Sequence, residues 1–442
     1  MEEQTSIPKH KFARAASLAK TGAAIGWNYA RYNVERSFNG EGDRAALDKA
    51  NAEATFKRFS KLKGSPLKVA QMLSMDKNIL PQPYAEEFQK SYYSAPPLSY
   101  PLVVQTFRRE IGKAPTDIFD EFSQKAVAGA SIGQVHRART GNHEYAVKVQ
   151  YPGVADSLKS DLNLVKPFAA TLFNLDLKAL APYFKEVEAR LMEETDYTLE
   201  LRRSQQLAAD SAHLPNTHFP QYYPELSGPR IITMDWVGGM TLDKFLKSDP
   251  PQEERDRIGQ ALWDFYHHQV HNLRVFHADP HPGNFHVDDG QLWVLDFGCV
   301  KVIEEDFYQK YFALMDDLRV NNPVDFQQML LDLDLLRPDD DAATRRKLAA
   351  VYLESVKILS QPFREAVFDF GDPSYVDSIY EFSQRTREDK ELAKITNARG
   401  DANAIYINRA YYGLYNIEAS LGARIRTQLP DLVESEAAAF VG

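Results

Sequence analysis

Cysteine is almost absent from this 442-residue chain, whose only cysteine is Cys299. A single cysteine excludes an internal disulfide and a metal site built from cysteines, and it suits a reducing compartment. Long apolar runs are also missing: the longest stretch without a charged residue, residues 91–107, contains three prolines and cannot form a membrane helix. The N-terminus lacks the apolar core of a secretory signal. We therefore expect a cytoplasmic protein that is soluble or peripherally bound to a membrane.

An excess of positive charge is missing as well. The chain has 52 Lys and Arg against 62 Asp and Glu, which gives a net charge of −10. This balance argues against a general affinity for nucleic acid. What the chain does have is length and 44% hydrophobic residues, enough for two or three domains with real cores.

Residues 277–298 carry the strongest functional signal. Asp279 and Asn284 stand five positions apart with His277 in the leading place, which is the H-x-D-x-x-x-x-N spacing of a kinase catalytic loop. Asp296 opens an Asp-Phe-Gly triplet twelve residues after the asparagine. An ordinary polar loop also gathers Asp and Asn, but the combined spacing favours phosphoryl transfer.

A short hairpin between these two motifs would bring them together. Residues 285–287 and 292–295 read as strands, and the Asp-Gly pair between them is typical of a tight turn. Asp279 would then orient the attacking oxygen. Asn284 and Asp296 would hold Mg²⁺ against the phosphates of ATP or ADP, because amide and carboxylate oxygens suit that ion.

A run of small residues at 126–133 predicts a strand-turn-strand whose backbone approaches a ligand closely. Its central residues would leave N–H groups free to face phosphate oxygens, although a plain Gly/Ala hairpin has the same composition. These residues are Ala128, Gly129, Ala130 and Ser131. The strand at 144–150 strengthens the nucleotide interpretation, because Lys148 stands in its middle like the lysine of V-A-I-K.

A lysine buried in this way needs a carboxylate partner. The acidic run 193–200, near the end of a helix expected to begin about Pro182, offers Glu194 and Glu200, and the pattern does not choose between them. Residues 230–234 predict another strand. The glycine-containing turn after it predicts a hinge, where Met234 and Val237 would offer backbone groups to an adenine edge.

The rest of the chain predicts helices and one basic surface. Helices are expected at 44–63, 66–75, 253–273, 304–318, 324–336, 342–359 and 408–421. Residues 9–36 carry six Lys or Arg against one acid, with aromatic residues between them. That pattern fits either an anionic membrane surface or a surface helix packed on the domain. By spacing alone, Lys68 and Gln71 share one helical face and read as solvated polar residues.

With these residues collected, the chain resembles the UbiB/AarF family of atypical protein-kinase-like proteins, from about residue 63 to 299 and more loosely at 408–415. The family's loop A-A-A-S-I-G-Q-V-H is matched at residues 128–136, with Gly129 in place of the middle Ala, and its H-x-D-x-H-P-G-N loop is unbroken at 277–284. By the same resemblance the remaining family motifs fall on these positions: K-x-G-Q on Lys68 and Gln71 with Ala70 in place of Gly, E-x-D on Glu194 and Asp196, and the glutamate that pairs with the nucleotide-site lysine on Glu200.

The resemblance implies a two-lobed α+β protein-kinase-like fold with a K-x-G-Q type helical extension over the active site. Lys68 and Gln71 would then face the nucleotide pocket and the E-x-D motif, and the extension would hinder a protein substrate. We expect a basic segment at 1–39, the extension at 40–100, an N-lobe at 101–240 and a helix-rich C-lobe at 241–442.

Three functions compete. The family is linked to ATP hydrolysis and to ubiquinone or other isoprenoid-lipid synthesis, so the first is an ATPase that supports this metabolism at a membrane. The second is a phosphotransferase acting on a protein or small-molecule hydroxyl. The third is a nucleotide-gated scaffold without catalysis. The expected partners are a nucleotide, an anionic membrane or isoprenoid lipid, and lipid-biosynthesis proteins, but no nucleic acid.

Overall fold

The computed structural model describes residues 28, 47–55, 98–130, 132–173, 181–278, 280–389, 391–392, 395 and 399–428. The chain forms two compact units that interleave in sequence. The N-terminal unit comprises Met1–Leu201 and Gln221–Trp236, and the C-terminal unit comprises Arg202–Pro220 and Val237–Gly442. The chain therefore passes between the units three times.

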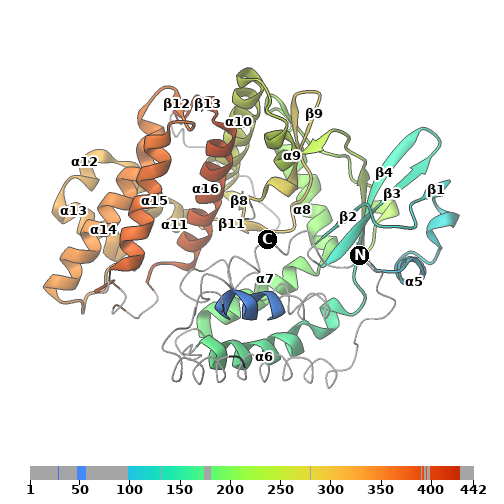
Figure 1. Ribbon diagram of the computed structural model, residues 1–442, viewed down its shortest axis with the longest axis horizontal. Coiled ribbons are helices and arrows are strands. Elements are labelled where there is room, and N and C mark those ends of the chain that lie inside the picture. Colours follow the sequence, from blue (N-terminus) through green and yellow to red (C-terminus); the bar gives the residue numbers. More distant parts are fainter. Residues whose placement is uncertain are drawn as a thin grey trace. The chain divides into compact units, whose positions relative to one another are not determined.

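An antiparallel sheet with the strand order β1-β3-β4-β6 forms the centre of the N-terminal unit, and β2 pairs with β3 (Figure 1). The strands are β1 (Glu121–Phe122), β2 (Ala128–Gly129), β3 (Gly133–Thr140), β4 (His143–Gln150) and β6 (Ile231–Asp235). Successive side chains of a strand point to opposite faces. Val147 and Val149 of β4 are accordingly buried on one face, and Ala146 and Lys148 on the other.

Helices cover both faces of this sheet. Helix α5 (Tyr100–Glu110) buries Val103 and Phe107 against the valine face. The opposite face is covered by the first turn of α8 (Tyr197–Asp210), where Tyr197 packs in one cluster with Ala146 and Ile232. The unit also contains α6 (Val154–Phe173) and α7 (Ala181–Glu194), and residues 47–55 are helical.

The described part of the C-terminal unit consists of three small sheets and a set of helices. The strands are β5 (Thr217–His218), β7 (Met240–Thr241), β9 (Phe285–Asp288) and β10 (Gln291–Val294) in the order β5-β10-β9-β7, with β8 (Val275–His277) against β11 (Val300–Val302) and β12 (Phe368–Asp369) against β13 (Arg424–Ile425). The helices are α9 (Leu242–Lys247), α10 (Gln252–His267), the π-helix η4 (His268–Leu273), α11 (Glu305–Phe312), α12 (Asp317–Val320), α13 (Pro323–Asp332), α14 (Ala342–Ser360), α15 (Pro373–Glu388) and α16 (Ala402–Leu421).

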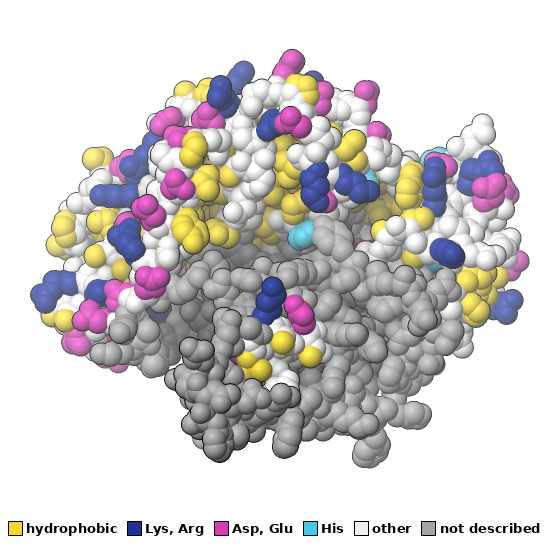
Figure 2. Space-filling view, in the orientation of Figure 1, with side chains coloured by type: hydrophobic (Ala, Val, Ile, Leu, Met, Phe, Trp, Pro, Cys, Tyr) yellow, Lys and Arg dark blue, Asp and Glu magenta, His cyan; other side chains and the backbone are white. Residues whose placement is uncertain are grey.

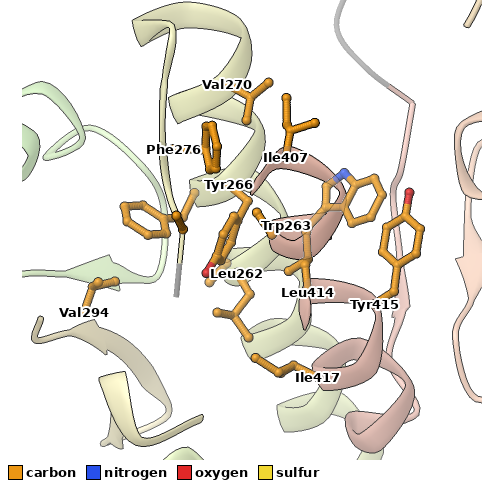
Figure 3. Packing of buried hydrophobic residues seen from close by; sticks show 14 of the residues in the cluster. Leu262, Trp263, Tyr266, Val270, Phe276, Val294, Ile407, Leu414, Tyr415 and Ile417 are labelled. Atoms are coloured by element: carbon orange, nitrogen blue, oxygen red, sulfur yellow. The ribbon is translucent and has the colours of Figure 1, made fainter. Parts of the chain in front are cut away.

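The core of the C-terminal unit lies between α10 and α16. Figure 3 shows Trp263 of α10 beside Tyr415 of α16, and their rings are stacked with centroids 6.1 Å apart. Leu414 and Ile417 of α16 are fully or almost fully buried in the same cluster, together with Phe276 of β8. This packing fixes α16 against the strand that leads into the predicted catalytic loop.

Lys/Arg and Asp/Glu side chains are interspersed on the face of the C-terminal unit visible in Figure 2. Within the part of the chain that the structure describes, no helix combines the length and hydrophobicity that a membrane crossing requires.

Several expected elements are corrected by the structure. Residues 304–318 do not form one helix, because α11 ends at Phe312 and the carboxylate of Asp316 caps a new helix, α12. The region beyond Val302 is not entirely helical, since it contributes β12 and β13. Helix α15 was not predicted, and α16 begins six residues before the expected start at 408. The expected helix at 66–75 lies outside the described residues.

Candidate active site

The predicted strand-turn-strand of small residues is confirmed as a hairpin. Ala128 pairs with Val135 and Gly129 with Gln134, and the Ala130 N–H donates to the Gly133 carbonyl at 2.9 Å. Ala128 and Gly129 are exposed, and a methyl group added at Gly129 would meet no atom within 4 Å. Ser131, the fourth residue of the predicted phosphate loop, lies outside the described residues.

Lys148 pairs with Glu200 inside the N-terminal unit. Its Nζ lies 2.6 Å from Glu200 Oε1, and the two side chains are only 10% and 7% exposed. The Tyr197 ring lies beneath the ammonium, with its centroid 5.2 Å from Nζ. Of the two acids left open by the sequence, Glu200 contacts the lysine, and Glu194 is the last residue of α7.

A break between two helices places Glu200. The helix expected to begin about Pro182 is α7, which ends at Glu194, and a separate helix that was not predicted, α8, begins at Tyr197. Gln150 Nε2 donates to the Thr195 carbonyl at 2.9 Å, which anchors the break to β4. Asp196 Oδ1 accepts the N–H groups of residues 198 and 199, each at 3.0 Å, and so caps α8. Glu200 then reaches Lys148 from the first turn of α8.

Gly133 allows this arrangement to close. A Cβ at that position would lie 2.6 Å from the Val149 carbonyl oxygen and 2.8 Å from Tyr197 Oη. Both atoms belong to elements that are fixed by the Lys148 pair and the β-sheet, so neither has room to move. A side chain at 133 would therefore separate the hairpin from the lysine strand.

A buried polar network behind the hairpin was not predicted. His136 Nδ1 lies 2.7 Å from the Ser123 carbonyl and must donate to it, so Nε2 accepts from Gln134 Nε2 at 2.8 Å. Gln134 Oε1 accepts the Leu98 N–H at 2.6 Å. Burial lowers the pKa of His136. The signal in the sequence is a pair of polar residues at alternate positions of a strand, both on its inward face.

The predicted hinge residues flank the point where the chain leaves the N-terminal unit. Met234 is buried in β6 opposite Ala146, and Val237 is buried at the start of the next segment of the C-terminal unit. Gly239 follows with φ +66°, and a Cβ there would lie 2.1 Å from the Val287 carbonyl oxygen. This position therefore requires glycine.

One side-chain and one backbone hydrogen bond join the predicted catalytic loop to the Asp-Phe-Gly segment. His277 Nε2 lies 2.7 Å from the Asp296 carbonyl, and the Ala278 N–H donates to the Cys299 carbonyl at 2.8 Å. These contacts fix the two residues that immediately precede Asp279. Asp279 itself lies outside the described residues.

Asn284 and Asp296 are held at the open end of the predicted hairpin, which is confirmed as β9 and β10. The Leu295 N–H donates to the Asn284 carbonyl at 3.0 Å, so the residue before Asp296 pairs with Asn284. Asp296 Oδ1 accepts the Gly298 N–H at 2.7 Å, and both side chains are half-buried. An amide and a carboxylate on joined loops are suitable ligands for Mg²⁺, which completes its shell with phosphate oxygens and water.

The structure does not describe the residues that the family resemblance assigned to the helical extension. Lys68 and Gln71 lie outside the described residues, so their expected contact with Glu194 and Asp196 stays a prediction. Asp196 has the structural role of capping α8.

The fold is that of a two-lobed α+β protein of the protein-kinase-like class. The ion pair of Lys148 with Glu200 and the joined loops that carry Asn284 and Asp296 agree with this class. The description "ABC1 atypical kinase-like domain" fits residues 91–329, which is more than half of the chain, and the chain therefore belongs to this family. The resemblance to UbiB proteins and the predicted fold class are thereby confirmed.

Relatives in several organisms are similar to this chain. Atypical kinase COQ8, mitochondrial, from Saccharomyces cerevisiae is 26% identical over 438 residues, covering 96% of this chain and 84% of its own. Protein ACTIVITY OF BC1 COMPLEX KINASE 8, chloroplastic, from Arabidopsis thaliana is 31% identical over 65% of this chain, which spans 39% of that relative's length. The Rv3197–erythromycin complex from Mycobacterium tuberculosis has a TM-score of 0.60 at 25% identity, covering 89% and 97% of the two chains.

Proposed function

We propose that this protein binds Mg-ATP and hydrolyses it, as an atypical kinase-like ATPase. The observation that carries the proposal is the buried ion pair of Lys148 and Glu200, at 2.6 Å. Burying two charges costs several kcal/mol per ion before their attraction offsets it. A lysine held in this way beside a hairpin of small residues is suited to contacting nucleotide phosphates.

Each residue of the site would have its own role in binding or hydrolysis. Lys148 would contact the α- and β-phosphates and Glu200 would orient it. Asn284 and Asp296 would hold Mg²⁺, whose positive charge would stabilise the phosphate oxygens. Asp279 would orient the attacking oxygen of water or of a small hydroxyl and accept its proton. Met234 and Val237 would offer backbone groups to the base. The same site could take ADP as its preferred ligand.

The setting that we propose is the surface of a membrane where isoprenoid lipids such as ubiquinone are made. Two relatives support it by their names, which place one in mitochondria and one in chloroplasts. The protein would act there with an isoprenoid lipid or with lipid-biosynthesis proteins as its partners. An anionic membrane would attract the basic segment 9–36.

An assay with γ-labelled ATP, with and without anionic liposomes, tests the proposal. Phosphate released to water supports the ATPase. Label on a small-molecule or protein hydroxyl supports a phosphotransferase, which the complete set of Lys, Asp, Asn and Asp also permits. Nucleotide binding with neither product supports a scaffold and contradicts the proposal.

Two variants separate chemistry from binding. Asp279→Asn should lower turnover by roughly 10²–10⁴-fold while nucleotide binding persists, because it removes only the proton acceptor. Asp296→Asn should instead weaken Mg-nucleotide binding, measured as loss of the ligand-induced rise in melting temperature. Near-normal hydrolysis by the Asp279 variant would reject the catalytic assignment.

A further inference from the structure

Helix α16 meets the predicted catalytic loop at a glycine. A Cβ built on Gly413 would lie 2.1 Å from Cγ and 2.7 Å from Cβ of Pro280, and 3.3 Å from the Pro280 carbonyl oxygen. Pro280 is the residue directly after Asp279 in the sequence. The proline ring is closed onto its own backbone nitrogen and cannot swing away as a free side chain would; a change of ring pucker moves mainly Cγ and leaves the Cβ contact of 2.7 Å. Backbone of α16 and the ring of Pro280 are therefore in direct contact.

Helix α16 is held in place on its other sides. Ile407 and Leu414 are fully buried against the core that contains α10 (Figure 3). Tyr415 Oη donates to the Leu359 carbonyl at 2.9 Å, which ties α16 to α14. Lys301 of β11 lies over the Tyr406 ring of α16, with Nζ 4.0 Å from the centroid. A side chain added at position 413 would therefore displace the loop rather than the helix.

The same residue is unexpected on local grounds. Glycine is among the least favourable residues in a helix interior, and Gly413 lies in the middle of α16. Its φ is not positive, so the backbone conformation does not require glycine. The close approach of Pro280 is the feature that does.

We infer that Gly413 is a positioning residue for the reaction: α16 supports the catalytic loop through it and sets the place of the residue that follows Asp279. The inference rests on the proposed ATPase function. A contact of 2.1 Å must open to about 3.4 Å before ordinary packing is restored, so a methyl group at 413 moves Pro280 by about 1 Å. A misplacement of that size can cost on the order of 10²-fold in rate.

Gly413→Ala is the first test. We expect kcat for ATP hydrolysis to fall by about 10- to 100-fold, while the affinity for Mg-nucleotide stays within about twofold, because Lys148 and Asp296 are untouched and the Leu295 N–H still holds the Asn284 carbonyl. Since alanine favours a helix more than glycine does, the melting temperature should fall much less than the loss of kcat would suggest. Amide hydrogen exchange in peptides covering residues 275–286 should rise, which reports on the loop without reference to activity.

A second substitution provides the rescue. Pro280→Gly removes both ring atoms that the new methyl group would meet, so Gly413→Ala/Pro280→Gly should recover at least about fivefold of the kcat lost by Gly413→Ala alone. Ser420→Ala, on the exposed side of the same helix, controls for a general effect of altering α16 and should leave kcat unchanged.

The outcomes separate this inference from the proposed function. If the wild-type protein hydrolyses ATP and Gly413→Ala does so at the same rate, the positioning role is overturned and the ATPase stands. If Gly413→Ala loses activity together with nucleotide affinity and fold, and Pro280→Gly restores nothing, the residue is structural only. If the wild-type protein does not hydrolyse ATP, the proposed function is rejected, while altered exchange in residues 275–286 would still support the contact.

Discussion

The ion pair of Lys148 and Glu200 allows a direct test at the level of single residues. Glu200→Gln removes one charge and leaves a buried ammonium, so the free energy of unfolding should fall by about 2–4 kcal/mol. Lys148→Met/Glu200→Gln removes both charges and should be less destabilised than Glu200→Gln. Urea denaturation of the three proteins measures these differences.

An exposed ion pair on the same sheet supplies the control. Arg137 of β3 contacts Glu144 of β4, and their side chains are 47% and 37% exposed. Glu144→Gln should change the free energy of unfolding by less than about 1 kcal/mol. A loss as large as that of Glu200→Gln would show that burial of the Lys148 pair is not the source of its effect.

Glu418 is a second residue whose charge the fold controls. It is fully buried in α16, and within the described residues neither of its carboxyl oxygens has a hydrogen-bond partner. Burial, and secondarily the nearby Asp264, raise its pKa well above the ordinary value of 4.5. The folded protein therefore holds a proton that the unfolded chain releases above about pH 4.5. The stability of the fold consequently declines as the pH rises from that value toward the folded pKa.

Glu418→Gln keeps the shape of this side chain and abolishes its titration. The variant should be more stable than the wild-type protein at pH 8. There the wild-type carboxyl must either keep a proton that the unfolded chain has released or ionise in a buried place, and the amide does neither. At about pH 3.5 the difference should largely disappear, because the carboxyl is then protonated in most unfolded chains as well as in the folded protein. Urea denaturation midpoints at the two pH values measure the effect, and equal midpoints at pH 8 would contradict it.

The role of a single residue could be predicted from the sequence where it follows from the residues that neighbour it along the chain. Lys148 was recognisable because a charged residue in the middle of an apolar strand requires an oppositely charged partner. In the structure that partner is the buried Glu200. Gln134 and Gly413 did not stand out. Gln134 acts through Leu98, 36 positions away in the sequence, and Gly413 through Pro280, and neither contact leaves a local pattern.

At the level of elements, the break between α7 and α8 decides which acid meets the lysine. Asp196 caps α8 with two backbone hydrogen bonds, and loss of such a cap costs about 0.5–2 kcal/mol. Asp196→Ala should therefore lower the melting temperature and weaken Mg-nucleotide binding, because the first turn of α8 carries Glu200. Thermal shift with and without Mg-ADP measures both effects.

Asp196→Ser distinguishes the cap from the role that the family resemblance implies. A serine hydroxyl caps a helix almost as well as a carboxylate, but it has no charge to offer Lys68. Recovery by serine of both the melting temperature and the ligand-induced shift would support the capping role. Recovery of the melting temperature alone would favour the contact with Lys68.

The elements found from the sequence were those with a strong local signal, such as the Asp289-Gly290 turn, where both residues have positive φ. Helix α15 was missed although Asp372 caps it and Pro373 occupies its first turn, because an Asp-Pro pair is also common in loops. The helix break before Tyr197 was missed because the Gln150 contact that anchors it comes from another part of the chain.

For the whole molecule, the interleaving of the two units could not be predicted from composition. The segment Arg202–Pro220 belongs to the C-terminal unit because β5 within it pairs in parallel with β10. Parallel pairing joins residues that are far apart in the sequence, and here one strand is only two residues long. The kinase-like class could be predicted from the sequence because its motifs are local. The assignment of segments to the two units could not, because it depends on pairing between distant residues.

Attachment to a membrane is a further property of the whole molecule, and the charge of the chain predicts how it would occur. The net charge is −10, whereas residues 9–36 carry six Lys or Arg against one acid. An anionic surface should repel most of the chain and attract this segment, at about 1 kcal/mol per basic residue near the surface. Deletion of residues 1–39 should therefore reduce sedimentation with phosphatidylserine liposomes by at least about tenfold.

Salt and lipid charge separate electrostatic docking from insertion of the aromatic residues. Raising the ionic strength from 0.1 to 1 M shortens the Debye length from about 10 to 3 Å and should release the full-length protein. Neutral phosphatidylcholine liposomes should bind it weakly at either ionic strength. Binding to both kinds of liposome alike would show that the basic residues of segment 9–36 are not the attachment, and the packed surface helix would then be the better description of that segment.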